Sequence, residues 1–70
     1  MKLTDPTVRA ILSLMRRKGW SVERTAEMIH VNRSTLYKRL NCPETIKLDE
    51  LRLLAKVFEV DIGALARGKQ

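Results

Sequence analysis

The chain has 70 residues, of which 14 are lysine or arginine and 8 are aspartate or glutamate, giving a formal net charge of +6. This length suits one small domain, and such an excess of positive charge is common in domains that bind a polyanion. With one cysteine and one histidine, the chain can form no internal disulfide and no zinc site of its own, and we expect no cofactor. It has no apolar segment of signal-peptide or membrane-spanning length, so we expect an intracellular protein that does not bind membranes.

The first expected helix covers roughly residues 6 to 18. Asp5 can cap its start, and Pro6 fits the first helical position, where no backbone donor is needed. An apolar stripe with helical spacing follows, formed by Val8, Ile11, Leu12 and Met15. Gly19 is a natural end for this helix, and Trp20 is expected to pack where it meets the next one.

The second and third expected helices meet at a turn near residues 29–31. Ser21 and Asn32 are good N-caps for the two helices, and Pro43 sets the end of the third because the residue before proline leaves the helical region. Ala26 is small, as required where two helices cross at a steep angle. The apolar residues expected to pack beneath the two helices are Val22, Ile29, Val31, Leu36 and Leu40.

Two further helices are expected in the rest of the chain. The first has a strong helical stripe consisting of Leu48, Leu51, Leu54, Ala55 and Phe58, with its leucines in the core. The last is short, is capped by Asp61, carries Ile62, Leu65 and Ala66, and ends before Gly68. No segment alternates with the period of a strand, so the predicted fold is all-α with five short helices.

The third helix has an outer face that is polar and basic and carries no acidic residue. At a DNA duplex, Arg33 can pair with both acceptors of a guanine, and Asn32 or Asn41 can pair with an adenine. The residues predicted to read bases are Asn32, Arg33, Ser34, Tyr37, Lys38 and Asn41.

A second group of residues flanks this helix and suits the phosphate backbone. The start of the second helix offers the Ser21 hydroxyl and free backbone N–H groups to an anion. The predicted phosphate contacts are Lys18, Ser21, Arg24, Arg39 and Lys47. A basic helix residue is often only solvated, and this alternative stays open for Arg24. For Arg39 the alternative is that its side chain turns away along the flank of the third helix.

Two segments of the chain resemble a known family. Within residues 20–40 the matching residues are Ser21, Ala26, Ile29, Val31, Ser34, Thr35 and Leu36. Residues 46–66 match at Ile46 to Leu51, Ala55, Phe58 to Asp61, and Leu65. Together they are similar to the Cro/C1-type (XRE) helix-turn-helix family of phage and bacterial repressors. Taken alone, the third helix is also similar to Fis and NtrC-type domains, but there the motif ends the chain, whereas here a further helical stripe follows.

The resemblance implies a single compact lambda-repressor-like domain over residues 1–70, with the helix-turn-helix in its second and third helices. It also implies a homodimer on a partly palindromic operator, with the third helix in the major groove. Three positions depart from the family. His30 stands where glycine is usual in the turn, Val22 where a glutamine holds a phosphate, and Arg39-Leu40 where an aromatic residue is usual.

The leading interpretation is a sequence-specific transcriptional regulator, a repressor or Cro-like switch protein, in the cytoplasm of a bacterium or a phage-infected host. Its expected partners are double-stranded DNA and a second copy of the chain, because one recognition helix reads few bases. The predicted dimer face consists of Leu53, Val57, Ile62 and Leu65.

A second interpretation is a small helical module that binds a protein, of the anti-repressor, antitoxin or polymerase-binding type, with DNA contact secondary. An exposed apolar patch on the third helix would favour this module, whereas the sequence places polar and basic residues there. An enzyme is not expected, because the chain has no glycine-rich phosphate loop and no spacing that gathers carboxylates around a metal.

Overall fold

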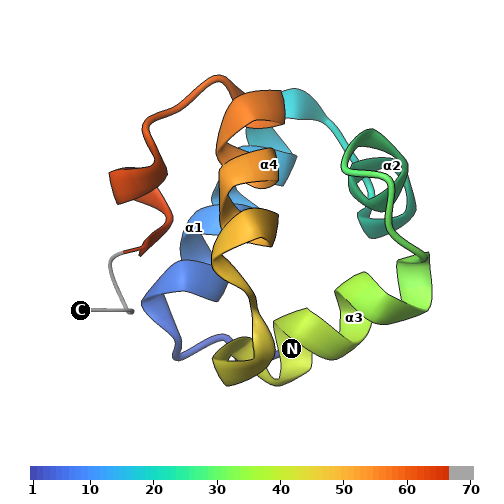
Figure 1. Cartoon of the computed structure of the whole chain (residues 1–70), viewed down its shortest axis with the longest axis vertical. Coiled ribbons are helices and arrows are strands. Elements are labelled where there is room, and N and C mark those ends of the chain that lie inside the picture. Colours follow the sequence, from blue (N-terminus) through green and yellow to red (C-terminus); the bar gives the residue numbers. More distant parts are fainter. Residues whose placement is uncertain (67–70) are drawn as a thin grey trace.

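A computed structural model describes residues 1–66 of the chain. Its elements are the α-helices α1 (Pro6–Lys18), α2 (Val22–Met28), α3 (Arg33–Asn41) and α4 (Leu48–Phe58), with the short 3-10 helices η1 (Pro43–Thr45) and η2 (Ile62–Ala64) (Figure 1). No strand occurs within these 66 residues, and none of their helices is long and apolar enough to cross a bilayer. The all-α prediction is confirmed.

The predicted count of five helices is not confirmed, because the last predicted helix is only a 3-10 helix within residues 1–66. Only the 3-10 helix η2 forms there, held by bonds of Ala64 N–H to the Asp61 carbonyl and Leu65 N–H to the Ile62 carbonyl, both 2.9 Å. Gly63 lies inside this segment and disfavours an α-helix, and so short a segment closes too few α-helical bonds to offset nucleation. Gly68, the predicted end, lies outside the described residues.

The first three helices begin at the predicted N-caps. The side chains of Asp5, Ser21 and Asn32 each accept a hydrogen bond of 3.0 Å from a backbone N–H in the first turn of α1, α2 and α3. Because these bonds satisfy donors that have no partner within the helix, they fix where each helix starts.

Three helices end in the same way. Gly19, His30 and Glu59 follow α1, α2 and α4 in left-handed backbone conformations, with φ of 71°, 59° and 58°. In each case the next residue donates its N–H to a carbonyl five residues earlier, at 2.9 to 3.0 Å. This is the Schellman arrangement, in which glycine is favoured. Two of the three positions therefore hold side chains in a conformation that costs free energy.

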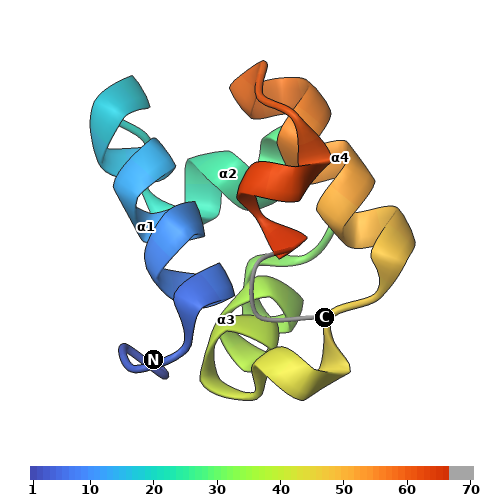
Figure 2. The ribbon, with the colours of Figure 1, turned by 90° about the vertical axis from the view of Figure 1, so that its left-hand side faces the viewer.

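A single apolar core lies among the four helices. Figure 2 shows α1 and α4 on opposite sides of the molecule, with α2 behind them and α3 below. The buried apolar side chains are Val8, Ile11, Met15, Val22, Ala26, Ile29, Leu36, Leu40, Leu51, Leu54, Ala55, Phe58 and Leu65. Trp20 packs its ring on Phe58 at a centroid distance of 5.3 Å, which connects the junction of α1 and α2 to α4.

The prediction that Leu48 is buried is wrong. Its side chain is 55% exposed, because α4 begins at this residue and the core-facing stripe starts one turn later, at Leu51. Helical spacing predicts which residues of α4 share a face, but it does not predict at which residue that face becomes covered by the core.

Candidate nucleic-acid interface

The turn between α2 and α3 is closed by small and aliphatic side chains. Ala26 is 1% exposed, and its carbonyl accepts the Val31 N–H at 3.0 Å. Ile29 and Leu36 are buried on either side of the turn, and Val31 is partly buried. The small residue lets the backbones approach, and the aliphatic ones fill the space between α2 and α3, as predicted.

This packing divides α3 into an inner and an outer face. Leu36 and Leu40 point into the core, with 3% and 0% exposure. All six residues predicted to read bases are exposed: Asn32, Arg33, Ser34, Tyr37, Lys38 and Asn41. A row of donors and cations on one side of a nine-residue helix has the dimensions and chemistry of a major-groove reading surface.

The two asparagines on this face differ in their availability. The Asn32 Oδ1 atom accepts both the backbone N–H and the hydroxyl of Ser34, each at 3.0 Å. Pairing with adenine requires the side-chain oxygen as an acceptor together with the amide group as a donor. Asn32 would have to give up its capping bonds to do this, so Asn41 is the better candidate for an adenine contact.

One acidic side chain reaches this surface from α2. The Tyr37 hydroxyl donates to Glu23 Oε2 at 3.4 Å, and both residues are exposed. Sequence reasoning missed this neighbour because it considered acids only within α3. Glu23 lies in the first turn of α2, and α3 passes close to α2 in a helix-turn-helix. These two facts could have predicted an acidic side chain near the outer face of α3.

Four of the five predicted phosphate contacts are exposed: Lys18, Ser21, Arg24 and Lys47. Lys18 Nζ lies 5.7 Å from the centre of the Trp20 ring, and Arg24 forms a 3.7 Å ion pair with Glu27. These exposed contacts are weak and leave the cations free to meet a phosphate.

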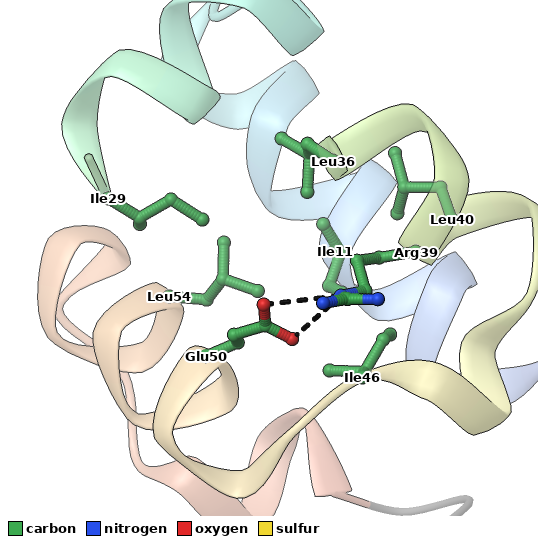
Figure 3. A pocket seen from close by; sticks show the side chains of 8 residues that line it. All are labelled: Ile11, Ile29, Leu36, Arg39, Leu40, Ile46, Glu50 and Leu54. Carbon is green, nitrogen blue, oxygen red and sulfur yellow. Dashed lines mark hydrogen bonds and ion pairs between the residues drawn. The ribbon is translucent and has the colours of Figure 1, made fainter. Parts of the chain in front are cut away.

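Arg39 takes the second of the two orientations that the sequence left open for it. Its Nε donates to both carboxylate oxygens of Glu50, at 3.1 and 3.2 Å, and its side chain is only 19% exposed. Figure 3 shows the guanidinium turned inward between α3 and α4. The Nε atom of Arg39 therefore belongs to the contact between these two helices.

A comparison with family models adds a match over nearly the whole described structure. The model described as Helix-turn-helix covers residues 6–65. The chain belongs to the Cro/C1-type helix-turn-helix family. It is therefore a DNA-binding transcription regulator of that type. Searches of curated proteins and of solved structures found no match.

Two departures from this Cro/C1-type family now have structural meaning. His30, in place of the usual glycine, adopts the left-handed conformation that the turn requires. Arg39, at a position where an aromatic residue is usual, forms an ion pair with Glu50. The family architecture is retained in both places with different chemistry.

The predicted dimer face is only partly available. Leu53 is 39% exposed, and Val57 and Ile62 are partly exposed. Leu65 is wrong as a surface residue, because it is 0% exposed and packs in the core of its own chain. Helical spacing placed Leu65 on an apolar side of the segment, but it could not tell whether a second copy or the chain's own core covers that side.

Proposed function

We propose that two copies of this chain bind a partly palindromic operator, that each copy places α3 in the major groove, and that the bound dimer represses transcription. The observation that carries the proposal is the exposed, acid-free outer face of α3, whose opposite side is anchored in the core by Leu36 and Leu40. A rigidly held row of donors can select base edges, whereas a mobile one would lose affinity on ordering.

The side chains divide into two kinds of contact. Arg33 has the fork of donors that suits guanine, and Asn41 has the free amide that suits adenine. Lys18, Ser21, Arg24 and Lys47 are exposed and suit phosphates, which position the protein without reading sequence.

Dimerisation would use the outer flank of α4. Leu53 and Val57 lie one helical turn apart and keep apolar surface exposed, and Ile62 adds to it from η2. One α3 reads too few base pairs for adequate discrimination, and two copies about 34 Å apart would read successive major grooves. The resemblance to phage and bacterial repressors supports repression as the outcome of binding.

The test begins with purified full-length chain, a pool of random duplexes, and sequencing of the DNA retained at moderate salt. The proposal expects a two-fold symmetric site with half-site centres about 10 base pairs apart. It also expects one dimer for each site in a mass measurement of the complex. Retention without enrichment would contradict sequence reading, and no retention even at low salt would favour the protein-binding module.

Repression needs a measurement of its own. The selected site is placed over the promoter of a reporter gene, and transcription is measured in a purified system with increasing amounts of the chain. The proposal expects transcription to fall as the site fills. Increased transcription would identify an activator and contradict the repressor assignment.

A further inference from the structure

A single carboxylate holds together two parts of the DNA-binding surface. The Glu50 side chain accepts the Arg39 Nε from α3, at 3.1 and 3.2 Å. Its Oε1 atom also accepts the backbone N–H of Lys47 at 2.9 Å. Arg39 belongs to the helix proposed to read bases, and Lys47 is the N-cap residue of α4 and a proposed phosphate contact.

The surroundings of the Arg39–Glu50 ion pair make its geometry strict. The side chains are 19% and 17% exposed and meet over an apolar floor formed by Ile11, Ile29, Leu36, Leu40, Ile46 and Leu54 (Figure 3). The cavity beside them leaves about 10 Å³ in which the centre of a water molecule can lie, enough for at most one water molecule. Little water is available to replace either partner, so the charges favour one arrangement.

This ion pair also joins two helices whose backbones approach each other closely at few points. α3 packs mostly against α2 and η1, whereas α4 packs mostly against α1 and η2. Among residues 1–66, the Arg39–Glu50 pair is the side-chain hydrogen-bonded link between α3 and α4. Leu36 and Leu40 of α3 and Leu54 of α4 share the apolar core, and the ion pair adds a directional polar link at its edge.

We propose that Arg39 and Glu50 are positioning residues for DNA recognition. They fix α3 relative to Lys47, so that base contacts and a backbone phosphate contact form together on one rigid surface. The proposal rests on the proposed function. A partly buried ion pair is weak evidence for a stabilising role, because apolar residues of similar size often stabilise as well or better. Control of geometry therefore explains the pair better than stability does.

The test uses the double variant Arg39→Met/Glu50→Met, which replaces both charges by apolar side chains and leaves the net charge unchanged. We expect it to remain folded, because removing the partly buried charges offsets the loss of the capping bond from the Lys47 N–H to Glu50, which costs about 1 kcal/mol. We expect its affinity for the duplex selected from the random pool to fall about tenfold, with a smaller loss on random duplex of the same length. A matched control is Asp49→Asn/Lys56→Gln, which removes one acid and one base from the exposed side of α4 and should bind both duplexes as wild type does.

Lys47 supplies a second readout. Lys47→Ala in the wild-type background should lower the slope of log affinity against log salt concentration by about one. In the double variant the slope should already be lower, and Lys47→Ala should change it little further. Wild-type affinity, or a full additional effect of Lys47→Ala, would overturn the positioning role. If the folded fraction of the double variant falls by the same factor as its affinity, the ion pair has a role in folding only.

Failure of the proposed function would look different. If no site is enriched with wild-type protein, the proposal of sequence reading fails. The slope of log affinity against log salt concentration on random duplex still tests whether the ion pair positions Lys47. An unchanged slope in the double variant would then overturn the positioning proposal independently.

Discussion

His30 and Gly19 hold the same left-handed backbone conformation at the ends of consecutive helices, with φ of 59° and 71°. Both also donate their N–H to a carbonyl three residues earlier, at 3.2 Å. Glycine reaches this conformation without penalty, whereas a residue with a Cβ atom incurs about 1–2 kcal/mol. The turn of the helix-turn-helix is therefore closed at the cost of local strain.

His30→Gly should relieve that strain. Glycine makes the unfolded chain more flexible, which lowers the free energy of unfolding by about 0.5–1 kcal/mol. Because the relieved strain is larger, we expect a net gain of about 0.5–1 kcal/mol in the free energy of unfolding. Chemical denaturation followed by circular dichroism measures the difference. The reciprocal control Gly19→Ala should lose stability, because nothing fills the space near Gly19 and only its φ opposes a side chain. A less stable His30→Gly chain would mean that the imidazole makes a compensating interaction.

Two buried threonines allow a second comparison within the same fold. Thr7 and Thr25 are both 0% exposed, but the Thr25 hydroxyl donates to the Ser21 carbonyl at 2.9 Å, whereas the Thr7 hydroxyl has no hydrogen-bond partner in the described structure. Thr7→Val should therefore leave stability unchanged or raise it, while Thr25→Val should lower it by about 1 kcal/mol. Equal losses in thermal unfolding would show that Thr7 has a partner, such as a bound water.

Helix starts and core stripes could be predicted from sequence because they depend on local chemistry. Asp5, Ser21 and Asn32 cap their helices through bonds to residues two or three positions away, and the cause of each is visible in the sequence itself. Most apolar residues at helical spacing are buried for the same reason.

The failures share a different cause. Leu48 and Leu65 each lie on an apolar stripe, but where a helix ends and which neighbour covers it are decided by tertiary packing. The sequence left two orientations open for Arg39, and its partner Glu50, eleven residues away on another helix, could not be identified from the sequence. Spacing within one helix carries no information about such a contact.

Glu23 provides a prediction about charge on the binding surface. Its carboxylate lies beside Tyr37 and would face the phosphates of a bound duplex, which oppose it. Glu23→Gln removes the charge and keeps an acceptor for the tyrosine hydroxyl, so affinity for random duplex should rise about two- to fivefold at low salt and less at high salt. Fluorescence anisotropy of labelled duplex measures this. The control Glu44→Gln changes an exposed acid of η1 by the same charge, and an equal gain there would mean that only net charge matters.

Arg33 and Lys18 should separate base reading from phosphate contact. Arg33→Ala should cost about 1–3 kcal/mol on the selected duplex and relax preference at one base position, because a guanine would lose a two-donor partner. Lys18→Ala should weaken selected and random duplexes alike and lower the salt slope by about one. Titration of both duplexes at several salt concentrations gives all of these quantities, and repeating the sequencing of retained DNA with Arg33→Ala identifies the base position concerned. If both substitutions weaken the two duplexes by the same factor, α3 does not read sequence through Arg33, and the base contacts must come from other residues of the exposed face.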